Sequence, residues 1–393
     1  MKILFLVYHG FSPSSGISKK IHYQVEGLRQ SGHDVRLCYY DFDSRGHRCR
    51  MVDGIVIQDY GCGRWAALRQ RTDYDCVYRY CASQGIRMVY ARSFQNASPW
   101  IIGLFRRLAR LGIRSVTEIP TYPYDQEFRG YPLQDRLLLK VDQLFRRRLA
   151  RQMDGIVTFS DCTTIFGQRC INISNGVDFA ATPMVVTRQH DDTSVHLIGV
   201  AEVHYWHGYD RLIAGLGLYY RQYGASARRV VFHLVGKVDE RGMKAEGRSI
   251  PSFSELIDTY GLHDVVVFHG QLFGKELDDV FNHCDFAVGS LARHRSGITR
   301  IKTLKNREYA TRGLPFVYSE TDADFDRQPY VLKVPADETP VDIRRILDFY
   351  DSRPWHPEDI RRSVEHLSWK SQMKKVVDAV FGCGSPCTIL NRE

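Results

Sequence analysis

The strongest constraint on the fold is an alternation of short apolar runs with amphipathic stretches. Residues 2–8 form an apolar run typical of a buried strand. Residues 19–31 have helical spacing that stops at Gly32, and residues 35–40 predict the next strand. Strands separated by helices favour a parallel sheet with helices on both faces. We therefore expect an α/β protein.

The alternation runs through the chain in two cycles. In the first half, further strands are predicted at 54–58, at either 76–80 or 88–92, and at 115–119, 155–159 and 170–173. The pattern stops near Asn175-Gly176-Val177-Asp178, and the polar stretch 178–192 predicts a linker. The second half predicts strands at 195–200, 229–235, 265–269, 286–289 and 315–318. A length of 393 residues suits two domains, which we place at 1–180 and 190–355.

Composition narrows the class of protein. Hydrophobic residues make up 44% and charged residues 25%, so a globular chain is expected rather than a disordered one. The ten cysteines contain no C-x-x-C pair, which favours reduced, structural cysteines. The N-terminus reads as a strand rather than a signal peptide, and no uncharged run of eighteen apolar residues predicts a membrane span. These features predict a cytoplasmic protein.

The net charge of +9 is concentrated in two segments, 104–114 and 136–151. The second places five apolar residues on one helical stripe that is flanked by arginines: Leu137, Val141, Leu144, Phe145 and Leu149. Such a helix either lies on an anionic membrane surface or packs its stripe into the core with a solvated basic face. No nucleic-acid-binding module accompanies the charge, so nucleic acid is not an expected partner.

Two segments carry candidate site residues, because ligands bind at the carboxyl ends of strands in doubly wound sheets. The turn from Gly10 through Ser15 to Gly16 follows the first strand. Either its N–H groups face a phosphate or an acceptor hydroxyl, or the turn only connects the strand to the helix. Residues 292–319 form a charged loop, a charged helix and a Gly-Leu-Pro turn into an apolar strand. The cations of this stretch are expected to neutralise a diphosphate, and its carboxylate to accept hydrogen bonds from a ribose. Its candidate residues are His294, Arg295, Gly297, Arg300, Lys305 and Glu308.

The L-K-x-R-E-Y-x-x-R-G-L-P-F run at 304–316, with Asn175-Gly176-Val177-Asp178 upstream, resembles the family-4-type retaining glycosyltransferases of the GT-B fold. The likeness is strongest to bacterial enzymes of capsular or extracellular polysaccharide synthesis, and residues 117–127, 158–161, 206–212 and 267–270 support it. The resemblance implies two Rossmann-like domains facing each other across a cleft. It also implies that residues 356–382 return to the first domain as a crossing helix, leaving 383–393 as a tail.

The resemblance also assigns roles on the donor side. Glu308 corresponds to the second glutamate of the family's Glu-x7-Glu pattern, which holds the donor ribose, whereas Arg300 stands where the first glutamate is expected. His207 stands at the position of the family's diphosphate-binding lysine, and Glu202 at or near that of its arginine. We expect Arg295, Arg300 and Lys305 to share the phosphate-binding work. The strand-end residues Gly236, Lys237 and Gly270 complete the predicted donor site.

On the acceptor side, the resemblance places a catalytic-side histidine or acid where Glu118 stands. This strand-end carboxylate either positions the acceptor or is satisfied by the backbone. Asp125 and Glu127 are further candidates. Three D-x-D runs match a metal-binding pattern of other glycosyltransferases, but they arise easily by chance; they lie at 41–43, 73–75 and 322–324. The resemblance implies a metal-independent reaction, so no metal or other cofactor is expected.

Together these features predict transfer of a sugar from a nucleotide diphosphate donor, with UDP as the expected nucleotide, to a glycan or lipid-linked glycan. The resemblance implies retention of the anomeric configuration. The departures at Arg300 and His207 keep a non-catalytic nucleotide-sugar-binding partner subunit open as an alternative. A nucleotide-sugar epimerase, which shares the two-domain architecture, is a further alternative.

Overall fold

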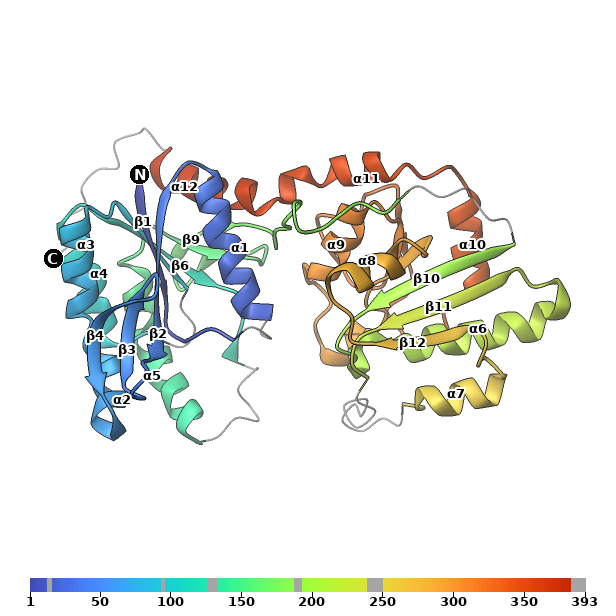
Figure 1. The fold of residues 1–393 in the computed structure, drawn as a ribbon, viewed down its shortest axis with the longest axis horizontal. Coiled ribbons are helices and arrows are strands. Elements are labelled where there is room, and N and C mark those ends of the chain that lie inside the picture. Colours follow the sequence, from blue (N-terminus) through green and yellow to red (C-terminus); the bar gives the residue numbers. More distant parts are fainter. Residues whose placement is uncertain (13–15, 93–95, 126–132, 187–192, 239–249, 383–393) are drawn as a thin grey trace. The chain divides into compact units, whose positions relative to one another are not determined.

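The computed structural model describes residues 1–12, 16–92, 96–125, 133–186, 193–238 and 250–382. The chain divides into two compact units (Figure 1). Unit 1 comprises Met1–Ser174 and Ser368–Glu393, and unit 2 comprises Asn175–Leu367. The first division therefore falls just before the predicted linker at 178–192. Of the segment 356–382, the part up to Leu367 belongs to unit 2, and the chain returns to unit 1 from Ser368.

Among the described residues, unit 1 contains a nine-stranded sheet in the order β4-β3-β2-β1-β5-β6-β7-β9-β8. The pairs from β2 through β1, β5, β6 and β7 to β9 are parallel, as predicted. The strands are β1 (Lys2–Val7), β2 (Asp34–Phe42), β3 (Arg48–Val52), β4 (Ile55–Gly61), β5 (Met88–Arg92), β6 (Arg114–Ile119), β7 (Gly155–Thr158), β8 (Thr164–Ile165) and β9 (Gln168–Asn172).

Two details of this sheet differ from or complete the prediction. Strand β3 has no predicted counterpart, and it joins β2 and β4 in an antiparallel extension of the sheet. Of the two alternatives for the fourth strand, Met88–Arg92 forms β5, whereas residues 76–80 lie in a helix. All five residues of β5 are buried, which is the environment of a central parallel strand.

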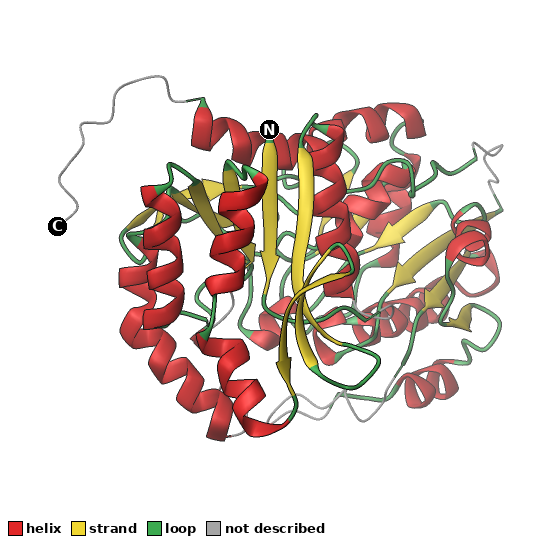
Figure 2. Ribbon diagram, turned by 60° about the vertical axis from the view of Figure 1, so that its left-hand side comes forward, coloured by secondary structure: helices red, strands yellow, loops and turns green. Residues whose placement is uncertain are grey.

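Helices cover both faces of the sheet in unit 1 (Figure 2). One face packs against α1 (Gly16–Gln30) and α12 (Trp369–Phe381), and the other against α3 (Asp75–Gln84) and α4 (Pro99–Arg110). The remaining helices of the unit are α2 (Gly63–Thr72) and α5 (Leu133–Ala150). Helices α1 and α12 cross closely at Gly27, where a Cβ would lie 2.6 Å from the backbone carbon of Trp369. A side chain at position 27 would therefore push the returning helix off the unit.

The two basic segments of unit 1 become α4 and α5, and they differ in what they bury. Helix α4 buries Ile101, Leu104 and Leu108 in the core, as a core-facing amphipathic helix does. In α5 the predicted stripe splits, because Leu149 is buried but Leu137, Val141 and Leu144 are exposed. No helix within the described ranges is sufficiently long and apolar to traverse a bilayer.

Unit 2 contains, within its described residues, a six-stranded parallel sheet in the order β12-β11-β10-β13-β14-β15. Its strands are β10 (Ser194–Val200), β11 (Arg229–Val235), β12 (Val266–Gly270), β13 (Phe286–Val288), β14 (Phe316–Tyr318) and β15 (Val331–Lys333). Its helices are α6 (Tyr209–Tyr223), α7 (Phe253–Tyr260), α8 (Gly274–Phe281), α9 (Leu304–Arg312), α10 (Ile343–Asp351) and α11 (Pro357–Ser363). Separate apolar clusters on the two faces of the sheet form its core. The predicted α/β class is therefore confirmed.

Candidate functional site

The strand order of unit 2 changes direction between β10 and β13, which is where ligands bind in doubly wound sheets. The segments that follow these strands meet at this edge. After β10 the chain forms a short 3-10 helix, η2 (Tyr205–His207), and after β13 another, η5 (Arg293–Ser296). The Leu291 N–H donates to the His207 carbonyl at 2.8 Å, and the Ser319 N–H donates to the Ser290 carbonyl at 3.0 Å. The carboxyl ends of β10, β13 and β14 are thus tied together.

Four ionisable side chains gather at this edge, and we call them the carboxyl-edge cluster: His207, Arg293, Lys305 and Glu320. Glu320 follows β14 and is only 2% exposed, yet neither carboxylate oxygen has a hydrogen-bond partner among the described residues. The Nε of Arg293 also lacks a partner there. Lys305 lies in the first turn of α9, with Nζ 3.5 Å from the Tyr209 hydroxyl. Buried polar groups are normally satisfied, so this cluster has unused bonding capacity.

The charged groups of the cluster influence one another's pKa values, although no ion pair joins them among the described residues. Burial raises the pKa of Glu320 to about 7, with Lys305 and Arg293 acting in the opposite direction. Burial also lowers the pKa of Lys305 to about 7, opposed by the Glu320 charge. Desolvation therefore works against the charged forms of both Glu320 and Lys305. An anion beside Lys305 and Arg293, with hydroxyl groups against Glu320, would supply the missing partners.

His207 contributes a neutral donor to the cluster. Its Nδ1 accepts a hydrogen bond from the His204 N–H at 2.9 Å, which leaves the proton on Nε2. Burial, together with the charges of Lys305 and Arg293, lowers the pKa of His207 far below its usual value. The position predicted to replace the family's lysine therefore holds a neutral imidazole, and Lys305 is the nearby ammonium group.

The structure gives Arg295 a different environment from the one expected. Its guanidinium is almost fully buried and forms ion pairs at 2.7 Å with both Asp210 and Glu338. His294 also binds Glu338, at 2.8 Å. These carboxylates neutralise Arg295 and hold η5 against α6, so Arg295 is not free to bind a phosphate. Arg293, two residues earlier, is the arginine of the carboxyl-edge cluster.

Arg300 is exposed, and its backbone pairs with Thr321 in an isolated parallel bridge. Thr321 is the neighbour of Glu320 in the chain. Arg300 stands where the resemblance expects a first glutamate. It therefore lies beside the segment that carries the buried carboxylate of Glu320. Glu320 was not predicted as a site residue, although a carboxylate two residues after the apolar strand β14 was an available signal.

Glu308 lies in α9, one third exposed, and its Oε1 accepts a hydrogen bond from Arg312 at 3.0 Å. Gly236 directly follows β11 and has φ of 132°, and a Cβ there would lie 1.8 Å from the Ala201 carbonyl oxygen, so only glycine fits. The Lys237 carbonyl accepts from the Val203 N–H at 2.8 Å. The other predicted glycines of this unit, Gly297 and Gly270, are exposed and have positive φ; Gly297 lies in a turn and Gly270 is the last residue of β12.

In unit 1, Glu118 is fully buried rather than exposed to an acceptor. Its Oε2 accepts hydrogen bonds from Gln24 at 2.6 Å and from Tyr90 at 2.5 Å, and Arg92 Nε lies 3.6 Å from Oε1. Burial alone would raise the pKa of Glu118, but the Arg92 charge and these hydrogen bonds hold it below its usual value. Its partners are side chains, not the backbone groups considered from the sequence.

The other acceptor-side candidates are dispersed. Asp125 forms a bidentate pair with Arg146, at 2.7 and 3.1 Å. Gly10 lies after β1, and a Cβ there would be 3.0 Å from the Tyr40 carbonyl oxygen. Gly16 begins α1 in open surroundings. Ser15 and Glu127 lie outside the described residues.

Each D-x-D run has an aspartate that forms an ion pair with an arginine of the chain. Asp322 and Asp324 both bind the buried Arg307. In the described part of the chain, one group has metal-ligand spacing, and it comprises Asp43, His47 and Asp59. Arg45 already bridges both of its carboxylates. A cation at that site would have to displace this arginine.

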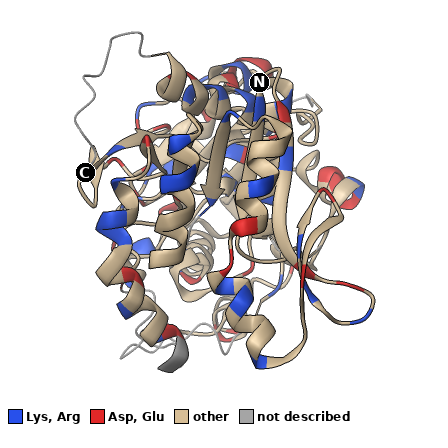
Figure 3. Cartoon of the chain, turned by 90° about the vertical axis from the view of Figure 1, so that its left-hand side faces the viewer, with Lys and Arg blue, Asp and Glu red and all other residues tan. Residues whose placement is uncertain are grey.

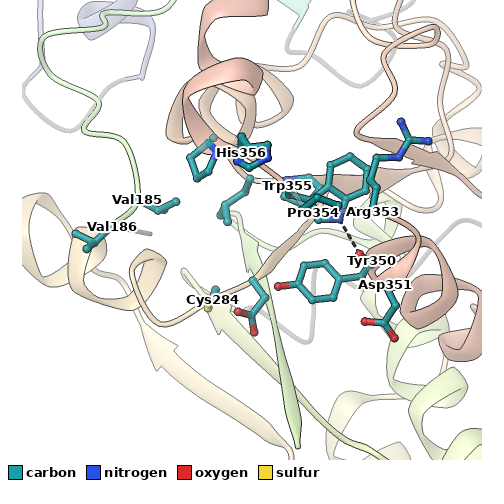
Figure 4. Close-up of a pocket in the computed structure, with 14 residues that line it drawn as sticks. Val185, Val186, Cys284, Tyr350, Asp351, Arg353, Pro354, Trp355 and His356 are labelled. Carbon is teal, nitrogen blue, oxygen red and sulfur yellow. Dashed lines mark hydrogen bonds between the residues drawn. The ribbon is translucent and has the colours of Figure 1, made fainter. Parts of the chain in front are cut away.

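A cavity of about 440 Å³ lies at the opposite, amino edge of the unit 2 sheet (Figure 4). Trp355 and Tyr350 line it, and the Trp355 indole donates to the Tyr350 carbonyl at 2.8 Å. Its carboxylates have partners, because Asp351 pairs with Arg228 and Asp285 accepts from the His196 N–H. This cavity is therefore less suited to a charged ligand than the carboxyl edge.

No protein-family model matches the chain, and no curated protein matches it. Solved structures do match over nearly its whole length. They include a sucrose-phosphate synthase from Thermosynechococcus elongatus, with a TM-score of 0.57, 15% identity, and coverage of 96% of this chain and 98% of the other. The apo lipopolysaccharide outer core galactosyltransferase WaaB gives a TM-score of 0.55, 11% identity, and coverage of 97% and 99%.

A third similar structure is the catalytic domain of starch synthase IV from Arabidopsis thaliana, bound to ADP and acarbose. Its TM-score is 0.54, with 13% identity and coverage of 96% of this chain and 98% of the other. At these identities the likeness shows the fold. The chain therefore has the GT-B fold, with two Rossmann-like domains and a last helix returning to the first.

Proposed function

We propose that this chain is a glycosyltransferase that moves a sugar from a nucleotide diphosphate sugar to a hydroxyl of a glycan or lipid-linked glycan. The observation that carries the proposal is the carboxyl-edge cluster, where two cations and a carboxylate lie at the switch point of unit 2 with no ion pair to them among the described residues. Perturbed ionisable groups at such a place are typical of a functional site. The similar structures that transfer sugars, such as the galactosyltransferase WaaB, support the same reaction class.

In this mechanism Lys305 and Arg293 bind the diphosphate, and the Nε2–H of His207 donates to one of its oxygens. Glu320 accepts hydrogen bonds from hydroxyls of the donor sugar, and Glu308 from those of the ribose. As the bond between C1 and the phosphate oxygen breaks, negative charge grows on the leaving group. Fixed cations in a buried site stabilise that charge strongly, and no metal is required for this step.

The acceptor hydroxyl forms the new bond to C1 on the face that the diphosphate leaves, which retains the anomeric configuration. Its proton passes to an oxygen of the departing diphosphate. The chain then needs no protein nucleophile, and paired carboxylates of the glycosidase type are not required. UDP remains the expected nucleotide, and capsular or extracellular polysaccharide the expected product class.

We also propose that unit 1 contacts the inner face of a membrane through α5, as a cytoplasmic peripheral protein. Leu137, Val141 and Leu144 are exposed on this helix among arginines, which is the composition of an interfacial helix. Figure 3 shows Lys and Arg recurring along the helices of this unit.

The test is a thermal-shift and calorimetric screen with UDP, GDP, ADP and their sugar conjugates, followed by a transfer assay. A ligand at a hundred times its dissociation constant adds roughly 2.7 kcal/mol of stability. We expect one nucleotide to bind, and its binding to be lost in Lys305→Met. Binding without transfer to any acceptor would favour the partner-subunit alternative, which the residues at 207 and 300 motivate. No binding of any nucleotide would remove the proposal.

A further inference from the structure

A groove of about 560 Å³ lies in unit 1 at the carboxyl ends of β1 and β2, and the mechanism above leaves it without a ligand. Residues of β2, β3, α2, α4 and α5, with the turn that follows β1 and other connecting segments, line it. The apolar part of its lining is unusually exposed for large side chains: Phe42 is 58% exposed, Trp100 52%, Leu68 49% and Val141 42%. Apolar residues from four separate elements gathered around one groove indicate a ligand with an apolar portion.

Behind the groove lies a buried positive charge without a counter-ion. The Arg50 side chain is fully buried, and its Nε and Nη1 have no hydrogen-bond partner among the described residues. Its Nη2 donates to the Tyr40 hydroxyl, and its guanidinium carbon lies 3.8 Å from the Tyr40 ring centroid and 5.3 Å from that of Tyr74. No carboxylate in the described residues pairs with it. A buried, unpaired charge is costly, so the position calls for a nearby anion.

The tyrosines that surround Arg50 also line the groove, so one layer of side chains separates the guanidinium from the space inside. Tyr8 belongs to the same lining, and its buried hydroxyl has no partner among the described residues. At the rim, Arg48 donates to the neutral Gln70 at 3.2 Å and lies over the Phe42 ring, and Arg71 is exposed.

The lining contains one carboxylate, Asp41, whose Oδ1 already accepts from the Phe42 N–H at 2.8 Å. Against it stand the two rim arginines and the buried Arg50. The balance of charge therefore favours an anion, and the open hydroxyl of Tyr8 offers it a donor. A phosphate has both the charge and the acceptor oxygens that such a setting satisfies.

We propose that this groove binds the lipid phosphate of a membrane-derived acceptor: a phosphate or diphosphate group above Tyr8 and Tyr40, with its hydrocarbon chain along Trp100, Leu68 and Val141. This assignment rests on the proposed glycosyl transfer, and it narrows the acceptor to lipid-linked glycans. A free sugar or a soluble polysaccharide would use neither the apolar wall nor the buried cation.

The probe is farnesyl diphosphate, a short-chain lipid phosphate, kept below its micelle concentration so that no bilayer is involved. Farnesol and inorganic pyrophosphate serve as the two halves of the probe. Binding is measured by calorimetry on the full chain without any sugar nucleotide. We expect farnesyl diphosphate to bind at least about tenfold more tightly than either half, because the groove offers both an apolar wall and a cationic floor.

Two matched pairs of surface variants locate the site. Trp100→Ala and Arg71→Glu change residues that line the groove, whereas Trp65→Ala and Arg69→Glu change exposed residues of α2 that do not. Trp100→Ala and Arg71→Glu should each weaken binding about tenfold, because each removes an apolar or charged contact. Trp65→Ala and Arg69→Glu should each change binding less than about twofold. Arg50→Met should weaken it further, and the surface pairs keep the test decisive if that variant does not fold.

The assignment would be overturned if a groove variant and its matched α2 control weakened binding equally. Equal affinity for farnesol and farnesyl diphosphate would also overturn it. Failure here is distinguishable from failure of the proposed transfer reaction. Nucleotide binding reports on unit 2 and is measured in a separate titration, so it can persist when the lipid-phosphate result is negative.

Discussion

Two glutamates, Glu118 in unit 1 and Glu320 in unit 2, occupy similar places in their units. Each lies at or just beyond the carboxyl end of a parallel strand, and each is at most 2% exposed. Their partners differ. Glu118 Oε2 accepts hydrogen bonds from Gln24 and Tyr90, and its Oε1 has no hydrogen bond among the described residues but faces Arg92 at 3.6 Å. Both oxygens of Glu320 lack hydrogen-bond partners among the described residues.

The pKa directions follow this difference, because that of Glu118 is lowered and that of Glu320 is raised to about 7. Burial alone therefore does not mark a functional carboxylate. A buried carboxylate that side chains of neighbouring elements already bond and face joins elements of the fold, whereas one with neither oxygen bonded has capacity for a ligand.

The strongest effect on activity should come from a change in the carboxyl-edge cluster of unit 2. Lys305→Met should reduce kcat/KM for sugar transfer by roughly 10²–10³-fold, because it removes a cation that faces the leaving diphosphate. Steady-state assays with the donor identified by the binding screen measure it. The matched control is Lys275→Met, an exposed lysine of α8 outside the carboxyl-edge cluster. Equal activity of the two variants would contradict the assignment of the site to unit 2.

The pH dependence of donor affinity sharpens the comparison next. Lys305 has a pKa of about 7 in the free protein, and a bound diphosphate would raise it, so binding takes up a proton. Affinity for a UDP-sugar should therefore fall as pH rises from about 7 to 9, by up to roughly tenfold per pH unit. A UDP-sugar suits this measurement because its phosphates have no proton to lose near neutral pH.

The control for this titration is the double variant Lys305→Arg with Glu320→Gln, which keeps the cation and removes both titrating groups. Its affinity, measured by calorimetry, should be flat over the same range. The neutral His207 contributes no slope there, because its pKa is far below 7. A slope that persists unchanged in the double variant would place the titrating group elsewhere.

Much of the fold was predictable, because apolar alternation and glycine turns are local signals. The run at 304–316 also located α9 and β14 at the candidate site. The sequence predicted Arg295 as the phosphate-binding arginine, and the replacement of Arg295 by Arg293 in this role was not predictable. It depends on the Arg295 partners Asp210 and Glu338, which lie 85 and 43 residues away in the chain. In the same way, no local pattern tells that Glu118 is met by Gln24, 94 residues away.

Glu118→Gln tests the buried carboxylate that already has side-chain partners. It should lower the free energy of unfolding by about 1–3 kcal/mol, because a buried, charge-assisted network loses its anion beside Arg92. Urea unfolding measures this, and Glu26→Gln, an exposed glutamate of α1, is the control. The pKa of Glu118 is depressed in the folded state, so its contribution is present above the unfolded pKa and is lost as pH falls through the folded one.

The difference between wild type and Glu118→Gln should therefore shrink in acid. Nucleotide affinity should be unchanged in this variant, since the nucleotide site is assigned to the other unit. A stable Glu118→Gln protein that has lost transfer but keeps donor binding would instead support the acceptor-side role predicted for Glu118 from the sequence.

The smallest effect concerns the exposed apolar residues of unit 1. Leu144→Ser should weaken binding to vesicles of phosphatidylglycerol and phosphatidylethanolamine by roughly fivefold, because a two-thirds exposed leucine loses part of its apolar transfer energy. Leu218→Ser changes an exposed leucine of unit 2 and should have no effect, if only unit 1 contacts the membrane. Vesicle sedimentation measures both. Electrostatic attraction from the arginines of α5 should remain in Leu144→Ser, so its residual binding should fall with added salt. Equal losses in the two leucine variants would mean that the apolar stripe of α5 is a surface feature without a membrane role, and that the two units do not differ in this respect.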